Sequence, residues 1–267
     1  MDGVILYDKP AGVTSHDVVA QVRRRLGRGV KVGHAGTLDP FATGLLLVLV
    51  GRATRLQRFL MALPKTYETV ARFGAVSTTG DRDGEIAETG NVPDGDVVLP
   101  TGVIRQRPPA YSAIKIDGQR AYTLARRGEH VELPEREVTV TAFEERWRKD
   151  PHRAYTIRCS SGTYVRSLIA DLGDAYCEEL RRTEIGAFAV ADADPELLIP
   201  INDAVGFLPA VQLDGELARK ASHGVAVPGT AEGPTRLTDD EGLIAIAEPR
   251  VGPDGTPELK PTVGLRG

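Results

Sequence analysis

The chain has 267 residues, of which 41% are hydrophobic and 26% are charged, and its formal net charge is −4. These values are typical of a soluble globular protein with one large domain, or with a main domain and a small second one. A membrane-spanning helix is excluded because the longest apolar run, Leu45 to Val50, is far too short to cross a bilayer. No signal-peptide pattern follows the N-terminus, so we expect a cytoplasmic protein.

The first thirty residues predict a strand followed by a helix. The apolar run Val4–Leu6 is typical of a short buried strand. Thr14 and Asp17 have the spacing of a capping box, and Gly27 supplies a stop signal, so a helix should lie between them. Its apolar face would consist of Val18, Val19, Val22 and Leu26.

The next segment predicts a central strand, a helix and another strand. The run from Leu45 to Val50 is bounded by glycines, which favours a buried strand. A helix with one apolar face should end at Pro64, and residues 67–73 predict the next strand. Residues 77–110 are rich in Gly, Asp, Thr and Pro, and we expect loops with little regular structure there.

The middle of the chain alternates between extended and helical patterns. Residues 111–128 begin extended and turn helical around residues 122–125. Strands are predicted at residues 138–143 and 155–159, where apolar and polar side chains alternate. An amphipathic helix should follow, with Val165, Leu168, Ile169 and Leu172 on one face.

Composition changes near residue 192, and a further break falls near Val211. Residues 192–267 carry 6 Lys and Arg against 13 Asp and Glu. Residues 211–267 show few helix signals and contain a strand-like run at residues 243–247. The whole chain therefore predicts a mixed α/β fold with a small β domain at its C-terminal end.

The two cysteines give no sign of a disulfide framework or a metal site. Cys159 lies in the predicted strand and Cys177 near the end of a helical segment, and we expect both to be packing residues. The five histidines are scattered, so we predict no metal site.

Positive charge is concentrated towards the N-terminus. Residues 1–191 carry 27 Lys and Arg against 24 Asp and Glu, so the acidic balance belongs to the C-terminal part. Phosphate binding depends on such local clusters rather than on whole-chain charge. The cluster Arg23, Arg24, Arg25, Arg28 and Lys31 is either a nucleic-acid contact or a solvated helix face.

The loop at residues 34–44 (HAGTLDPFATG) contains the most informative acidic residue. Asp39 is the only acidic residue between Asp17 and Glu68, and it lies in a segment punctuated by glycine and proline. Its carboxylate is either placed for chemistry or caps its own turn, which is the commoner role of Asp in such loops. Local composition leaves both interpretations open.

Six separated segments resemble one family, the bacterial tRNA pseudouridine-55 synthases (the TruB family). They occur in order over about 185 residues and cover most of the chain. The segments are residues 3–15 (GVILYDKPAGVTS), 31–44 (KVGHAGTLDPFATG), 65–67 (KTY), 108–118 (PPAYSAIKIDG) with its continuation 120–128 (RAYTLARRG), 162–172 (GTYVRSLIADL) and 180–188 (LRRTEIGAF).

The resemblance implies a catalytic role for Asp39. Pseudouridylation breaks the C1′–N1 bond of uridine and remakes it as C1′–C5, without redox change, cofactor or metal. A single carboxylate nucleophile suits this chemistry. The family pairs that carboxylate with an arginine, which here is Arg166, and places a tyrosine, here Tyr67, against the uracil.

Other residues carry weaker implications. Tyr164, Leu180 and His34 match positions that line the family's uridine pocket, although Leu180 would equally suit a core and His34 a loop-ordering hydrogen bond. Lys9 matches a lysine that we treat as structural support for the site.

The resemblance also implies a fold and a partner. Residues 1–209 would form a pseudouridine-synthase-like catalytic domain, with an RNA-gripping insertion at about residues 111–136, and residues 210–267 a PUA-like module. The partner would be the T-arm stem-loop of tRNA, with the target uridine flipped out of the stack. No cofactor, no membrane and no obligate protein partner is implied, and we expect a monomer. Candidate phosphate contacts are Arg24, Arg28, Lys31, Lys115, Arg120, Arg126 and Arg127.

Two other functions remain alternatives. One is a guide-RNA-dependent synthase of the box H/ACA type, which the short acidic C-terminal end disfavours. The other is a non-catalytic protein that binds or folds tRNA. Binding alone would not require Asp39, Tyr67 and Arg166 together.

Overall fold

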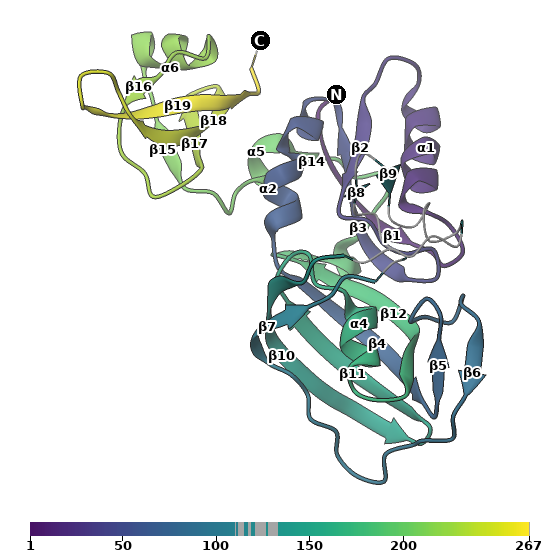
Figure 1. Cartoon of the computed structure of the whole chain (residues 1–267). Coiled ribbons are helices and arrows are strands. Elements are labelled where there is room, and N and C mark those ends of the chain that lie inside the picture. The colour runs from purple at the N-terminus through teal and green to yellow at the C-terminus, as the bar shows by residue number, and fades with distance from the viewer. Residues whose placement is uncertain (110, 112–114, 117–118, 121–126, 128–132, 267) are drawn as a thin grey trace.

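The computed structural model describes residues 1–109, 111, 115–116, 119–120, 127 and 133–266. Two β-sheets organise the chain, a large sheet in the main body and a smaller one near the C-terminus (Figure 1). The large sheet has the strand order β14-β1-β3-β12-β4-β11-β10-β7, with β2 paired to β3 and β13 paired to β12. Its strands are β1 (Gly3–Lys9), β2 (Val32–Ala35), β3 (Thr43–Val50), β4 (Lys65–Phe73), β7 (Gly102–Gln106), β10 (Arg136–Lys149), β11 (His152–Cys159), β12 (Ala175–Ile185), β13 (Phe188–Ala189) and β14 (Ile199–Pro200).

Helix α1 (Ser15–Leu26) confirms the capping-box prediction. The Thr14 side chain accepts a hydrogen bond from the Asp17 amide, and the Asp17 carboxylate accepts one from the Thr14 amide at 2.8 Å. The helix ends at Gly27. Its buried valines pack on β1 and β3, while Arg23, Arg24 and Arg25 are exposed.

Strand β3 is the buried strand that the run Leu45–Val50 predicts, because apolar layers cover both of its faces. Leu46, Val48 and Val50 pack against α1. The alternate residues, including Leu45, pack towards η1 (Gly51–Leu56) and α2 (Gln57–Ala62). The predicted helix before Pro64 is thus confirmed, although its first turn is a 3₁₀ helix.

Strand β4 shows the alternation that defines the two faces of the sheet beyond β12. Tyr67, Ala71 and Phe73 point to one face, where α4 (Val165–Ala170) packs (Figure 1). Glu68 and Val70 therefore point to the opposite face. Helix α4 is shorter than predicted, and Leu172 packs against the same core from just beyond its end.

Strand β12 corrects the prediction that Cys177 lies at the end of a helical segment. Cys177 is fully buried within β12, between β3 and β4 in the middle of the large sheet. The segment is rich in Glu and Arg, which hides its alternation. The charged side chains find partners far along the chain: Arg181 pairs with Asp8 at 2.7 Å, and Glu184 accepts a hydrogen bond from Thr66 at 2.7 Å.

The expectation of loops throughout residues 77–110 is wrong in part. The structure has a two-stranded hairpin of β5 (Ala75–Ser77) and β6 (Ile86–Glu88) and the edge strand β7. These strands are short, and their residues are mostly exposed, so they lack the apolar periodicity that predicts a strand.

The smaller sheet has the order β15-β17-β18-β19-β16 and follows α5 (Ile201–Ala204). Its strands are β15 (Ala210–Gln212), β16 (Val227–Pro228), β17 (Thr235–Asp239), β18 (Gly242–Val251) and β19 (Pro257–Gly264). Helix α6 (Gly215–Ser222) was not expected from the sequence, which shows few helix signals there. Its apolar residues are mainly alanine and leucine, and they pack on this sheet. The sheet contacts α2, where Arg58 pairs with Glu248 at 2.7 Å.

Part of the predicted insertion lies outside the described residues. Strands β8 (Lys115–Ile116) and β9 (Gln119–Arg120) pair as a short antiparallel hairpin. The helix predicted around residues 122–125 falls on undescribed residues. Among the residues that the structure describes, no helix is long and apolar enough to cross a membrane.

Replacement of Gly44 by alanine should strongly destabilise the large sheet. Gly44 has φ +103°, and a Cβ there would lie 2.2 Å from the carbonyl oxygen of Arg182, its partner in the parallel β3–β12 pair. We expect the free energy of unfolding, measured by chemical denaturation, to fall by roughly 3 kcal/mol or more. Gly90→Ala is the control, because Gly90 has φ +74° and a Cβ there would meet no other atom within 4 Å, so its loss should be only about 1 kcal/mol. Equal losses would contradict the close-packing explanation.

Candidate active site

Asp39 lies in the loop between β2 and β3, and its neighbours anchor that loop. The Leu38 amide donates to the Ser15 hydroxyl at 2.9 Å, and Leu38 and Phe41 are buried. The Lys9 ammonium group donates to the Pro40 carbonyl at 3.3 Å. With these neighbours fixed, the Asp39 side chain keeps 34% of its surface exposed. The loop therefore presents a single carboxylate from a rigid support.

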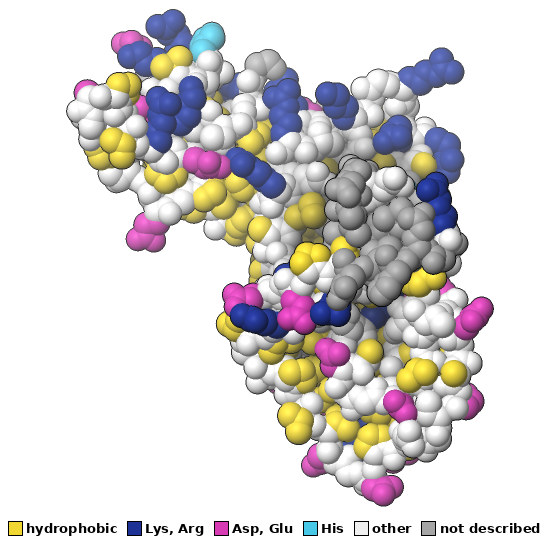
Figure 2. Space-filling view, viewed as in Figure 1, with side chains coloured by type: hydrophobic (Ala, Val, Ile, Leu, Met, Phe, Trp, Pro, Cys, Tyr) yellow, Lys and Arg dark blue, Asp and Glu magenta, His cyan; other side chains and the backbone are white. Residues whose placement is uncertain are grey.

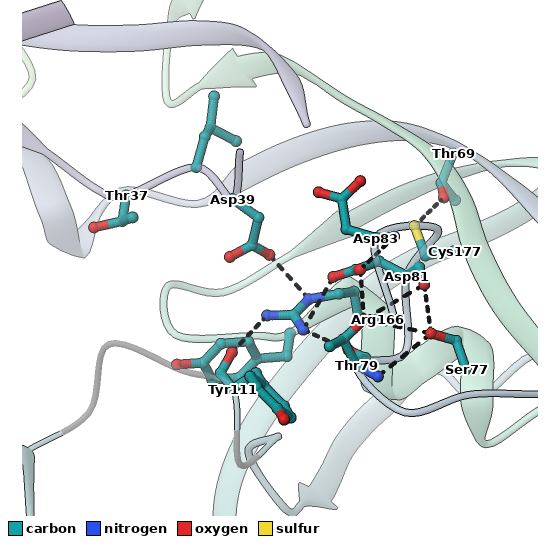
Figure 3. A network of polar contacts seen from close by, with 12 residues as sticks. Thr37, Asp39, Thr69, Ser77, Thr79, Asp81, Asp83, Tyr111, Arg166 and Cys177 are labelled. Carbon is teal, nitrogen blue, oxygen red and sulfur yellow. Dashed lines mark hydrogen bonds and ion pairs between the residues drawn. The ribbon is translucent and has the colours of Figure 1, made fainter. Parts of the chain in front are cut away.

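Arg166, on α4, holds the Asp39 carboxylate in place (Figure 3). Its Nε atom lies 2.9 Å from Oδ2 of Asp39, and its Nη1 atom lies 3.3 Å from Oδ2 of Asp81. The guanidinium also donates to the carbonyls of Thr79 at 2.6 Å and Tyr111 at 2.9 Å. Only 4% of the Arg166 side chain is exposed. The cation is thus fixed between two carboxylates, one buried and one open to a substrate.

Asp81 is the buried carboxylate of this network, and a tight turn orients it. Its Oδ1 atom accepts hydrogen bonds from the Thr79 hydroxyl at 2.6 Å and the Asp83 amide at 3.1 Å. These contacts leave Oδ2 directed at Arg166, as Figure 3 shows. The Arg166 guanidinium therefore pairs with two carboxylates, those of Asp81 and Asp39, rather than with Asp39 alone.

The surroundings raise the pKa of Asp39 above the ordinary value of 3.8. Burial of the carboxyl group is the main cause, and the Asp81 carboxylate adds to it. The Arg166 guanidinium opposes both effects. A carboxylate with a raised pKa is a better base and nucleophile than an ordinary one, provided that it stays ionised at neutral pH.

Lys9 and Tyr67 lie close to this network from β1 and β4. Lys9 is fully buried and donates to three backbone carbonyls, those of Pro10, Val13 and Pro40, and burial lowers its pKa to about 8. Tyr67 is buried, and this raises the pKa of its hydroxyl group. Both lie close enough to Asp39 for their charges to interact with it. The structure thus gathers Lys9, Asp39, Tyr67 and Arg166.

Of the remaining pocket candidates, only Leu180 shares a described apolar cluster with Tyr67. Leu180 belongs to the same apolar cluster as Tyr67, Leu38 and Phe41. Tyr164 precedes α4, with the Arg136 guanidinium 4.8 Å from the centre of its ring. His34 lies on β2 in edge-to-face contact with His16 of α1 at 5.3 Å.

The predicted phosphate contacts differ in how far the structure describes them. Arg24, Arg28, Lys31 and Arg127 are exposed. Figure 2 shows Lys and Arg side chains gathered mainly over the upper part of the molecule, whereas Asp and Glu predominate around its lower end. Lys115 and Arg120 belong to the β8–β9 hairpin, and Arg126 lies outside the described residues.

Three polar residues of the site were not predicted as such from the sequence. Asp81 and Arg182 are buried beside the catalytic candidates, and Gln106 clamps the start of α4 through both backbone groups of Tyr164, at 2.8 and 2.9 Å. A signal existed for Arg182. Residues two positions apart in a strand point to the same face, so Arg182 would share a face with Leu180. Recognising β12 as a strand would therefore have placed Arg182 near the pocket.

A mixed sheet that brings together one presented carboxylate, its arginine partner and a buried tyrosine forms a candidate enzyme site. The described residues contain no group of three or more His, Cys, Asp or Glu side chains able to hold a metal ion. The family profile described as TruB family pseudouridylate synthase (N terminal domain) matches residues 23–165.

The chain belongs to this family of pseudouridylate synthases, since full-length relatives also match it. It is 44% identical to the tRNA pseudouridine synthase B of Thermobifida fusca (strain YX), over 94% of this chain and 96% of that protein. It is 38% identical to the tRNA pseudouridine synthase B of Geobacillus thermodenitrificans (strain NG80-2), over 93% of this chain and 92% of that protein.

Solved structures show the same fold. A Cbf5–Nop10–Gar1 complex contains a chain that matches with a TM-score of 0.72 and 25% identity, over 98% of this chain and 84% of that chain. A chain of an H/ACA RNP bound to a substrate RNA containing 2′-deoxyuridine matches with a TM-score of 0.70 and 23% identity, over 99% of this chain and 86% of that chain.

Proposed function

We propose that the protein converts uridine 55 in the T-loop of tRNA to pseudouridine, with Asp39 as the nucleophile. The Asp39–Arg166 ion pair at 2.9 Å is the observation that carries this assignment. It joins two of the six family-like segments into one site. The names of the relatives support tRNA as the substrate.

The chemistry requires that Asp39 attack and later leave again. The carboxylate adds to the flipped nucleotide, the C1′–N1 bond breaks, the uracil turns, and C5 bonds to C1′ in place of N1. The bond to the carboxylate then breaks, C5 loses its proton, and N1 gains one. The overall reaction is an isomerisation, so neither a cofactor nor an oxidant is consumed. Arg166 favours the ionised form of Asp39 and fixes its direction. Burial of Tyr67 and the apolar residues beside it keeps water away from the detached base.

The RNA must give up the stacking of its target base. That costs a few kcal/mol, which contacts in the pocket and to phosphates offset. Tyr67 supplies an aromatic surface for the uracil, and Leu180, Tyr164 and His34 complete the pocket. Cations of α1 and of the segment that follows it, together with cations of the insertion, contact the backbone of the T-arm. These are Arg24, Arg28, Lys31, Lys115, Arg120, Arg126 and Arg127.

The large sheet belongs to the catalytic part of the chain and the smaller sheet to a second module. Residues 1–209 form the catalytic domain, with an insertion at about residues 111–136 that grips RNA, and residues 210–267 form a PUA-like module. The acidic balance of the C-terminal part suits a supporting role more than strong phosphate binding. The protein acts as a cytoplasmic monomer without an obligate protein partner.

Purified protein and an unmodified tRNA transcript test this function. Pseudouridine should form at position 55 only, as mapped by carbodiimide modification and primer extension, without any other protein or guide RNA. A transcript with cytidine at position 55 should yield no pseudouridine, and an isolated T-arm stem-loop should suffice as substrate.

The same assay separates the alternatives. Product that appears only after guide RNA and partner proteins are added would identify a box H/ACA-type synthase. Binding of tRNA without product would identify a non-catalytic RNA-binding protein. Product at another uridine would retain the enzyme class and overturn the assigned position.

A further inference from the structure

A second buried arginine, Arg182, lies beneath the site on β12, with 1% of its surface exposed. Its Nε atom donates to the Leu45 carbonyl of β3 at 2.7 Å. Its Nη2 atom donates to the Gly36 carbonyl at 3.0 Å, and its Nη1 atom donates to the Thr37 carbonyl at 3.5 Å. One guanidinium thus connects β12, β3 and the loop that presents Asp39.

The charge environment of Arg182 differs from that of Arg166. Arg166 lies between the carboxylates of Asp39 and Asp81. Arg182, by contrast, forms no ion pair with any carboxylate in the described part of the chain, and its hydrogen bonds go to neutral carbonyl groups. Carbonyl dipoles stabilise a buried cation without cancelling its charge, so Arg182 keeps a positive field inside the protein.

The positive charge of Arg182 acts on Tyr67. Arg182 and Tyr67 are opposite each other in the antiparallel β12–β4 pair. The guanidinium lies close enough to the phenol for its charge to oppose the rise in the pKa of Tyr67 that burial causes. Among the described residues, Cys159 of β11 and Asp39 also act on Tyr67, and both raise its pKa. Arg182 is therefore the principal cation that favours negative charge on the Tyr67 oxygen.

The same field reaches two buried lysines. Arg182 helps to lower the pKa of Lys9 and that of Lys65, each to about 8, although burial is the main cause for both. Lys65 is held by the carbonyls of Met61 and Leu63. Both lysines should therefore release their protons more readily than an ordinary lysine does.

We propose that Arg182 is a positioning residue for uridine isomerisation, which fixes the Asp39 loop through its hydrogen bonds and supports negative charge on the Tyr67 oxygen through its unneutralised cation. The proposal rests on the function assigned above to Asp39 and Tyr67. Two properties of the Arg182 side chain are involved, the planar geometry of its guanidinium group and its positive charge. Different substitutions remove them.

A titration of residue 67 tests the charge. With 3-fluorotyrosine incorporated at position 67, ¹⁹F NMR of the full chain without RNA reports the ionisation of that phenol alone. Arg182→Gln removes the charge but retains donors for the carbonyls, and it should raise the titration midpoint by about one pH unit. Arg182→Lys keeps the charge and should leave the midpoint within about 0.3 pH unit of the parent. Arg158→Gln, an exposed arginine of β11, is the control and should not move the midpoint.

Kinetic measurements test the role of the planar guanidinium geometry of Arg182. Both Arg182→Gln and Arg182→Lys should lower kcat on unmodified tRNA by about tenfold or more, with little change in KM, because the buried guanidinium does not face the RNA. A merely structural role would lower the melting temperature and leave the ¹⁹F midpoint of the folded protein unchanged.

An unchanged midpoint in Arg182→Gln would overturn the proposal. If that variant does not fold, Arg182→Lys decides, because a rise of about one pH unit in its midpoint would show that the charge is not what acts on Tyr67. The titration requires neither RNA nor turnover. Failure of the proposed function would therefore appear as a lack of product with the titration behaviour intact.

Discussion

Replacing Asp39 with asparagine should abolish pseudouridine formation while the protein folds and binds tRNA as before. The amide has nearly the same shape but is not a nucleophile, and the loss of a nucleophile typically costs an enzyme more than about a thousandfold in kcat. The loop should stay in place because Ser15 and Lys9 bond to the residues on either side of Asp39. Single-turnover formation of pseudouridine on unmodified tRNA measures the effect.

The control and the pH dependence make this prediction specific. Asp94→Asn, an exposed residue in a surface loop, should retain full activity. In the wild type the rate should fall on acidification with a midpoint above 3.8, because burial raises the pKa of Asp39 and only the carboxylate reacts. Near wild-type turnover by Asp39→Asn would show that another group performs the attack.

Local signals account for the parts of the site that the sequence predicted. The capping box of Thr14 and Asp17 and the stop at Gly27 set the bounds of α1, and the apolar run of β3 set the central strand. Asp39 was recognisable as the one acidic residue in a glycine- and proline-punctuated loop. Its assignment as a nucleophile depended on the resemblance of distant segments, which supplied Arg166 and Tyr67 as neighbours.

Strand β12 could not be predicted from its own residues, because its buried charges look like those of a solvent-exposed segment. Arg182 is buried only because β3 and the Asp39 loop provide carbonyls for it, 137 and 146 positions away in the chain. Such a partner set exists only in the folded sheet. The prediction failed where tertiary contacts override local composition.

Asp81 illustrates the same limit within the site. An Asp in a segment of Ser, Thr and Gly ordinarily caps a turn, and Asp81 does this through Thr79 and Asp83. Its second function comes from Arg166, whose guanidinium also bonds to Thr79, 87 positions away. A residue can therefore satisfy a local rule completely and still belong to the polar network of a candidate site that the rule does not reveal.

Arg166→Lys should nearly abolish activity, even though the positive charge is retained. The guanidinium of Arg166 contacts two carboxylates and two carbonyls at once, from a side chain that is 4% exposed. A lysine ammonium is a compact charge and cannot match that planar set of acceptors. We expect kcat to fall by about a hundredfold or more, because Asp39 loses its fixed direction. Steady-state kinetics on unmodified tRNA measures this.

Stability measurements show what the positive charge of Arg166 contributes to the folded protein, whereas kcat reports the effect of its geometry on Asp39. Arg166→Met leaves Asp81 buried without its cation, and loss of one partner of a buried pair typically costs about 3–5 kcal/mol, which chemical denaturation would detect. Arg148 offers a matched control, because it bridges Asp96 and Glu145 at the protein surface, where ion pairs contribute little. Arg148→Lys and Arg148→Met should therefore leave both stability and activity nearly unchanged. If Arg166→Lys retained wild-type kcat, charge alone would suffice beside Asp39, and the two-carboxylate geometry would have no role in catalysis.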